Sequence, residues 1–383
     1  MLRDYNKIPY LLLTPGPLST SPSVRSAMWY DSCTWDDDYK NIVSDIRRRL
    51  LHISDCDPSM YTTVLMQGSG TFGVESVLGS SIHKKNDCVL ILVNGVYGKR
   101  MVDIVDTLEL CHVVCEVDEN QSFTYDQVKD VLDKAKEITH IAMVHCETTT
   151  GIINALEPIA KLAHAYQKHF IVDAMSSFGG VEIDMTGLSI DFLISSANKC
   201  IQGVPGFSFV ICKKEKLTTL CKDNAKSLSL DLYGQWREME KDAGKWRYTS
   251  PTHVVLAFHQ ALLELEEEGG IAARSRRYTM NQHILSNGMR ALGFESYIST
   301  DLQSPIITTF LEPERIPGTL KKFLFKPFYT YLKNHGFVIY PGKVAHTNSF
   351  RIGSIGHLFP KDITNFLSHV KSFIEEPTLS IVS

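Results

Sequence analysis

Short β-branched and apolar runs alternate with helical patterns between residues 61 and 213, and this alternation limits the possible fold more than any other feature. The strand-like runs, in chain order, are TTVLM (62–66), VLILV (89–93), HVVCEV (112–117), HIAMVH (140–145), FIVDA (170–174), DFLISS (191–196) and FSFVIC (207–212). Segments with apolar residues at helical spacing separate them, such as Val74, Val77, Leu78 and Ile82. Buried strands joined by crossover helices predict an α/β fold with a mainly parallel sheet covered on both faces.

The last third of the chain follows a different order. A long helical pattern, THVVLAFHQALLELEEEGG (252–270), leads into a second helix through Met289. Strands near 305–312, 336–340 and 349–353 and a helix at about 319–335 follow. We expect a smaller α+β C-terminal domain over residues 266–383 and a large domain over residues 21–265. The N-terminal segment, residues 1–20, is expected to pack with the small domain.

Charge, cysteine content and hydropathy exclude several functions. The net charge of −4 provides no attraction to nucleic acid or to an anionic membrane. The nine cysteines are an odd number and form no C-x-x-C pair, so we expect neither a disulfide framework nor a metal site. The first residues, MLRDYNKIPYLLLTPGP, do not fit a signal peptide, and apolar runs stay far below the ~20 residues of a spanning helix. A cytoplasmic location is therefore expected.

The stretch GSGTFG (68–73) is a glycine-rich turn between an expected strand and an expected helix. A dinucleotide-binding turn needs an acidic residue about 20 residues later, at the end of the second strand. Here that strand ends at Asn94, which disfavours a nicotinamide or flavin nucleotide. Gly68 and Gly70 still allow backbone N–H groups to approach an anion, and the dipole of the following helix favours it. The turn suits a phosphate monoester as well as a pyrophosphate.

Two further strands end in residues that can perform chemistry. FIVDA delivers Asp173 at its carboxyl end, and DFLISSANKCIQGVPG places Lys199 shortly after another strand. A lysine on such a turn can form a Schiff base, and a neighbouring aspartate can pair with a pyridinium nitrogen. Each residue alone is more often a turn former or a solvated charge. Together with the phosphate-binding turn, they outline one cofactor site.

At this point the chain resembles the class V group of fold-type I pyridoxal-phosphate aminotransferases over nearly its whole length. The matching motifs are LTPGP (13–17), QGSGTFGVE (67–75), HCETTTGI (145–152), VDAMSSFGG (172–180), SSANKCIQGVPG (195–206), YTSPTHVV (248–255) and FRIG (350–353). The resemblance implies a seven-stranded sheet between helices and pyridoxal 5′-phosphate as the cofactor. It also implies a homodimer with shared active sites.

The resemblance assigns roles to individual residues. It implies that Lys199 forms a covalent bond with the cofactor and that Asp173 pairs with the nitrogen of the cofactor ring. The residues implied to bind the cofactor phosphate are Ser69, Gly70, Thr71 and Asn198.

Three further cofactor contacts are implied, each with an ordinary alternative. Tyr97 would stack on the ring, or be a half-buried core aromatic. Thr148 would lie near the phenolic oxygen, or cap a turn. Thr249 would reach the phosphate site of the neighbouring subunit, or cap the helix that follows it.

Two residues are implied to bind substrate. Arg351 matches the arginine that binds the substrate anion, the alternative being a structural ion pair, and its fork suits a carboxylate or a phosphonate. Gly16, in the LTPGP turn, would bring backbone close to small substrates, or belong to a plain turn.

Within the family, four stretches resemble the enzymes that transfer an amino group from 2-aminoethylphosphonate to pyruvate: CTWDDDY, YTTVLMQGSGTFGVE, VHCETTTGI and RYTSPTHVVLAF. That activity would produce phosphonoacetaldehyde and L-alanine by a ping-pong mechanism. An alanine or serine:glyoxylate aminotransferase is the nearest alternative. A cysteine desulfurase is disfavoured because the last cysteine is Cys221, far from a C-terminal loop. The three aspartates within CTWDDDY have an ordinary explanation as well, because acidic residues are favourable at the start of a solvent-exposed helix.

Overall fold

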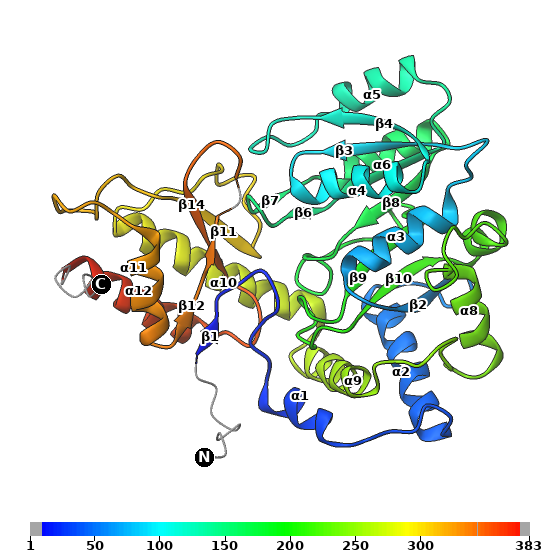
Figure 1. Cartoon of the computed structure of the whole chain (residues 1–383), viewed down its shortest axis with the longest axis horizontal. Helices are drawn as coiled ribbons and strands as arrows, with labels where there is room; N and C mark the ends of the chain where they lie inside the picture. The colour runs from blue at the N-terminus through cyan, green and yellow to red at the C-terminus, as the bar shows by residue number, and fades with distance from the viewer. Residues whose placement is uncertain (1–9, 343, 376–383) are drawn as a thin grey trace.

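Seven strands form the central sheet of the chain, in the order β2-β10-β9-β8-β5-β3-β4 (Figure 1). The computed structural model describes residues 10–342 and 344–375. The strands are β2 (Tyr61–Gln67), β3 (Cys88–Val93), β4 (Cys111–Glu116), β5 (His140–Val144), β8 (His169–Asp173), β9 (Phe192–Ser196) and β10 (Phe207–Lys213). Only β10 runs antiparallel to its neighbours in this sheet. The predicted mainly parallel sheet and all seven predicted strands are confirmed.

Helices cover both faces of this sheet because the side chains of each strand alternate between two cores. In β3, Leu90 and Leu92 belong to one core, to which α2, α5, α6 and α9 contribute, whereas Val89 and Ile91 belong to the other, to which α3 and α4 contribute; α8 contributes to both. These helices are α2 (Asp37–Ile53), α3 (Gly70–Ser81), α4 (Val96–Thr107), α5 (Tyr125–Lys134), α6 (Leu156–Ala165), α8 (Leu232–Lys241) and α9 (Thr252–Glu267). Short elements complete this region: α1 (Pro22–Ser26), η1 (Ala27–Trp29), β6 (Cys146–Glu147), β7 (Ile152–Ile153), α7 (Lys214–Lys216) and η2 (Leu217–Cys221).

A second, smaller unit follows α9 and lies beside the large sheet (Figure 1). Its elements are α10 (Gly270–Ala291), β11 (Ile307–Leu311), α11 (Phe325–Asn334), β12 (Phe337–Val338), β13 (Tyr340–Pro341), β14 (Ser349–Gly353) and α12 (Pro360–Glu375). Strands β11, β14 and β13 form one sheet, while β12 pairs with β1 (Leu11–Leu12) of the N-terminal segment. The N-terminal segment is thereby fastened to the C-terminal unit.

One element of this unit differs from expectation. The helix predicted over 319–335 begins only at Phe325. Pro327 explains the difference, because a proline ring collides with the carbonyl of the residue four positions earlier and so tolerates only the first helical turn. Residues 1–9 and 376–383, at the outer ends of the predicted N-terminal segment and small domain, lie outside the described residues.

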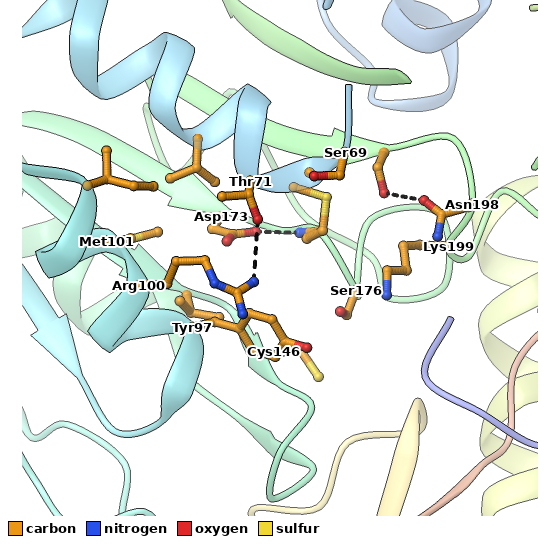
Figure 2. Close-up of a pocket in the computed structure, with 16 residues that line it drawn as sticks. Ser69, Thr71, Tyr97, Arg100, Met101, Cys146, Asp173, Ser176, Asn198 and Lys199 are labelled. Carbon is orange, nitrogen blue, oxygen red and sulfur yellow. Dashed lines mark hydrogen bonds between the residues drawn. The ribbon is translucent and has the colours of Figure 1, made fainter. Parts of the chain in front are cut away.

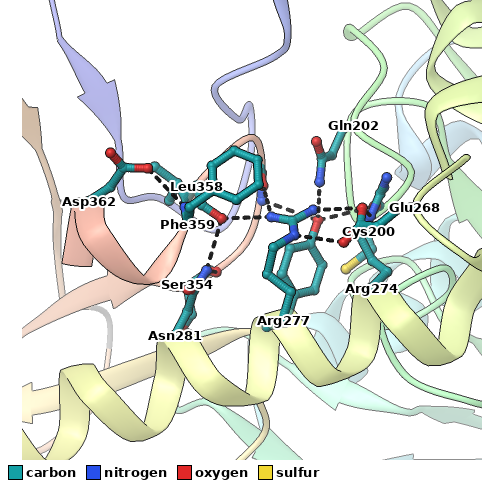
Figure 3. A network of polar contacts seen from close by, with 12 residues as sticks. Cys200, Gln202, Glu268, Arg274, Arg277, Asn281, Ser354, Leu358, Phe359 and Asp362 are labelled. Atoms are coloured by element: carbon teal, nitrogen blue, oxygen red, sulfur yellow. Dashed lines mark hydrogen bonds and ion pairs between the residues drawn. The ribbon is translucent and has the colours of Figure 1, made fainter. Parts of the chain in front are cut away.

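Helix α10 joins the two units through a network of polar contacts (Figure 3). The buried Arg274 donates to the carbonyl of Cys200 at 2.8 Å and to Glu268 at 2.6 Å. Arg277 also contacts Glu268 and donates to the carbonyl of Leu358 at 2.6 Å. Buried charge-assisted hydrogen bonds of this kind have a defined geometry. The turn that contains Cys200 is thus held against the C-terminal unit.

Among the described residues, no helix combines the length and the apolar character required to cross a membrane.

Candidate active site

A pocket of about 250 Å³ opens where the central strands end (Figure 2). Strands β2, β5, β8 and β9 lead to it, as expected for a parallel sheet, whose ligands gather at the carboxyl ends of the strands. The residues that line it are Ser69, Gly70, Thr71, Val74, Tyr97, Arg100, Met101, Ile104, Val144, Cys146, Asp173, Met175, Ser176, Ser196, Asn198 and Lys199. Seven residues predicted from the sequence are therefore brought together: Ser69, Gly70, Thr71, Tyr97, Asp173, Asn198 and Lys199.

The N-terminus of α3 forms one wall of the pocket. Gly68 has a φ of 110°, a conformation that favours glycine, and it turns the chain from β2 into the helix. A Cβ atom at Gly70 would collide with the end of the Met175 side chain, so a larger residue there requires Met175 to move. The side chain of the N-cap residue Ser69 makes no capping hydrogen bond. The first N–H groups of the helix, which have no intrahelical partners, therefore face a site suited to an anion.

Asp173 and Lys199 are two oppositely charged residues that line the pocket. Burial raises the pKa of Asp173 to about 6, although its Oδ1 accepts a hydrogen bond from the Met175 N–H at 2.8 Å. Burial also lowers the pKa of Lys199 to about 8. The Lys199 Nζ donates to the carbonyl of Pro15 at 2.8 Å. A lysine amine is nucleophilic only without its extra proton, so this environment prepares Lys199 for reaction near neutral pH.

Glu147 positions the start of α4, which carries Tyr97. Its carboxylate is fully buried and accepts hydrogen bonds from the N–H groups of Gly98 at 2.8 Å and Tyr97 at 3.3 Å. Burial raises the pKa of Glu147 to about 7, while the two N–H groups oppose the rise. An acid at the N-terminus of a helix stabilises it through the free N–H groups and the helix dipole. Tyr97 is half-buried and its ring contributes to the pocket wall.

Arg351, Thr148 and Gly16 lie next to the pocket rather than in its wall. Arg351, on β14, is buried and donates to the carbonyls of Thr148 at 3.0 Å and Pro341 at 3.1 Å. No acidic side chain within residues 10–342 and 344–375 pairs with it, so these residues form no structural ion pair with Arg351. A buried guanidinium without a carboxylate suits an anionic ligand.

The Thr148 hydroxyl is fully buried and has no hydrogen-bond partner, so it caps no turn. A buried hydroxyl of this kind is rare and calls for a ligand or a water. Gly16 has a φ of 127°, and a Cβ atom there would lie 2.6 Å from the Lys199 Nζ. Any side chain at position 16 would therefore displace the lysine.

Thr249 is exposed and is not among the residues that line the pocket. The alternative that it caps the next helix is wrong, because α9 begins at Thr252 after the N-cap residue Pro251. The aspartate run behaves as an ordinary helix start: Asp36 is the N-cap of α2, and its side chain accepts a hydrogen bond from the Asp38 N–H.

Three polar residues of this region were not among the sequence predictions. Arg100 and Ser176 line the pocket, and Glu147 holds the helix that borders it. Arg100 follows Tyr97 by three residues, so helical spacing alone places both on one face of α4. Glu147 gave no such signal, because its partners are backbone groups about 50 residues away in the chain.

The fold resembles that of solved aminotransferases. The structure resembles an alanine–glyoxylate aminotransferase from Nostoc sp., with a TM-score of 0.85, 23% identity and 97% of each chain covered. It also resembles a pyridoxamine-pyruvate aminotransferase from Mesorhizobium loti, with a TM-score of 0.84 and 23% identity over 97% of this chain and 94% of the other. At such identities the likeness concerns the fold.

Sequence similarity identifies the family. The family described as aminotransferase class-V matches residues 38–324, and the chain belongs to this family. A 2-aminoethylphosphonate–pyruvate transaminase of Bacillus cereus (strain ATCC 10987 / NRS 248) is 54% identical over 94% of this chain and 97% of its own. A bifunctional phosphonoacetaldehyde hydrolase/aminoethylphosphonate transaminase of Clostridioides difficile (strain 630) is also 54% identical, over 95% of this chain. This chain spans 56% of its length.

The lowered pKa of Lys199 predicts its reactivity. Its amine should lose the extra proton near pH 8, so capture of a small aldehyde, trapped by borohydride, should rise with a midpoint at about 8. Peptide mass spectrometry of protein free of bound cofactor would follow the modified residue, with a lysine peptide as reference. A midpoint for Lys199 near the ordinary value of about 10.4 would contradict the burial argument.

Proposed function

We propose that this chain is a pyridoxal-phosphate-dependent aminotransferase that converts 2-aminoethylphosphonate and pyruvate to phosphonoacetaldehyde and L-alanine. The observation that carries the proposal is one pocket lined by a half-buried lysine, a buried aspartate and a helix N-terminus suited to an anion. Two relatives that are 54% identical over at least 94% of this chain are named as aminoethylphosphonate transaminases, and the name of one also includes pyruvate, which supports the choice of substrates.

The residues present fit pyridoxal phosphate. Ser69, Gly70 and Thr71 at the start of α3, with Asn198 nearby, would hold the phosphate, because their N–H and hydroxyl groups suit a phosphate monoester. The unpaired buried hydroxyl of Thr148 would donate to the phenolic oxygen.

The ring of the cofactor would be held by two more residues. Tyr97 would stack against it, and Asp173 would accept a hydrogen bond from its nitrogen. When bound, the cofactor supplies an electron sink for the carbon that bears the amino group.

Lys199 is the proton carrier of the proposed reaction. Released by the incoming amine, its Nζ would take the proton from the carbon bearing the substrate amino group and deliver it to the C4′ carbon of the cofactor. An amine with a pKa of about 8 can both accept and return a proton near neutral pH. Asp173, already ionised above about pH 6, would keep the proton on the ring nitrogen.

Arg351 would bind the acidic group of both substrates in turn. Its guanidinium makes two hydrogen bonds to carbonyls and retains further N–H donors for an anion. The fork can donate hydrogen bonds to two oxygens of a carboxylate or of a phosphonate, so one residue can bind both 2-aminoethylphosphonate and pyruvate. Alternating use of one pocket agrees with the ping-pong order.

We also propose that the enzyme acts as a homodimer in the cytoplasm. The exposed position of Thr249 leaves it free to contact the phosphate site of a second subunit. The cysteines of the described residues are free thiols, which is typical of a reducing compartment.

Replacing Lys199 tests the proposed activity. Purified wild-type protein should produce phosphonoacetaldehyde and L-alanine from 2-aminoethylphosphonate and pyruvate, detected by mass spectrometry. Lys199→Ala should lower turnover by roughly 10² to 10⁴-fold or more, because it removes the group that moves the proton. The matched control is Lys99→Ala, an exposed lysine outside the pocket, which should keep full activity. Unchanged turnover in the Lys199 variant would refute the mechanism.

Substitution of Arg351 should weaken the binding of both substrates. Arg351→Gln removes the charge and the fork, so the Michaelis constants for 2-aminoethylphosphonate and for pyruvate should each rise about tenfold to hundredfold, from a charge-assisted interaction of about 1.5–3 kcal/mol. Steady-state kinetics with each substrate varied would measure this, with circular dichroism to verify the fold. A rise for only one substrate would show that the two acids bind to different residues.

A further inference from the structure

Arg100 extends into the pocket but has no role in the function proposed above. It lies on the first turns of α4, and its Nη1 donates to the Thr71 hydroxyl at 3.4 Å, a long and weak hydrogen bond. The guanidinium carbon lies 4.9 Å from the centre of the Tyr97 ring. Figure 2 shows the side chains of Arg100 and Thr71 pointing toward one another across the pocket.

The guanidinium of Arg100 retains most of its hydrogen-bonding capacity. Arginine has five N–H donors, and the Thr71 contact is the one hydrogen bond that the described residues give it. No carboxylate within residues 10–342 and 344–375 forms a salt bridge with it, although its charge is near enough to Asp173 to oppose the rise in the pKa of that acid. The guanidinium lies over the Tyr97 ring, a cation–π contact that uses none of its N–H donors. The side chain is therefore oriented and ready for an anion.

Charge balance identifies that anion. The charged residues that line the pocket are two cations, Arg100 and Lys199, and one acid, Asp173. In the proposed function Lys199 bonds the cofactor carbonyl carbon and Asp173 pairs with the ring nitrogen. A phosphate monoester carries a charge of about −1.5 to −2 at pH 7, whereas a helix N-terminus supplies only about +0.5. Of the lining residues, Arg100 alone remains to neutralise the rest.

We propose that Arg100 binds the phosphate of the cofactor together with Thr71, and that Tyr97 holds the guanidinium in place. The proposal rests on the function proposed above. A planar fork that donates two parallel hydrogen bonds matches phosphate oxygens better than a lysine does. Tyr97 then has two partners, the cofactor ring and the arginine. Residues from two separate helices, α3 and α4, thereby form one phosphate site.

Affinity for two aldehydes tests this role, since pyridoxal lacks only the phosphate. Binding of pyridoxal phosphate and of pyridoxal to cofactor-free protein would be measured by absorbance for wild type, Arg100→Gln and Arg100→Lys. Arg100→Gln should bind pyridoxal phosphate about tenfold to hundredfold more weakly, the effect of one charge-assisted hydrogen-bonded pair, and bind pyridoxal as wild type does. Arg100→Lys should recover part of the loss, because it keeps the charge. Lys99→Gln, on the same helix but outside the pocket, is the control.

A second readout does not depend on catalysis. Inorganic phosphate should raise the thermal unfolding midpoint of cofactor-free wild-type protein, because a ligand that binds only the folded state stabilises that state. The increase should be smaller for Arg100→Gln, which binds phosphate more weakly.

Three results for Arg100→Gln would overturn the proposal: an equal loss of affinity for both aldehydes, no loss of affinity for either, or an effect confined to the binding of the amino donor. If wild type binds pyridoxal phosphate and transfers amino groups while Arg100→Gln binds both aldehydes normally, only the role of Arg100 fails. If wild type binds no pyridoxal phosphate, the proposed function fails as well.

Discussion

The partial removal of Lys199 from water is the constraint on which the rest of the site depends. A lysine in water keeps its extra proton up to a pH of about 10.4 and is a poor nucleophile at neutral pH. Here burial lowers the pKa of Lys199 to about 8, and the carbonyl of Pro15 accepts a hydrogen bond from its Nζ. Pro15 belongs to the N-terminal segment, which is fastened to the C-terminal unit through β1 and β12. The reactivity of one side chain thus depends on both ends of the chain.

Docking of the two units also fixes the turn that carries Lys199. Arg274 and Arg277 of α10 bind the carbonyls of Cys200 and Leu358, which belong to different units, and share Glu268. From the C-terminal unit, Arg351 reaches the carbonyl of Thr148 in the large unit. Neither unit alone provides both the lysine and the proposed anion site for substrate. This explains why residues far apart in the sequence contribute to one chemical task.

Strong local patterns made the large sheet predictable. Six of the seven strands are mostly buried runs, and only the edge strand β4 is largely accessible. A parallel sheet gathers the residues at strand ends, so Ser69, Asp173 and Lys199 could be placed together in advance. The helix expected from residue 319 was misplaced because Pro327 limits its start. Glu147 could not be predicted as a structural residue, since it binds backbone N–H groups of a distant helix and backbone groups leave no trace in sequence patterns. Arg100 was visible in principle, three residues after Tyr97, but its orientation depends on tertiary packing.

The most direct test of the account is the absorption spectrum of purified protein loaded with pyridoxal phosphate, recorded with one amino donor at a time. The account predicts that addition of 2-aminoethylphosphonate abolishes the visible band of the lysine-bound cofactor and that pyruvate restores it. Because each half of a ping-pong exchange is observed separately, the result identifies the donor as well as the reaction. Loss of the band with L-serine or L-alanine but not with 2-aminoethylphosphonate would instead indicate a glyoxylate aminotransferase and contradict the proposed substrate.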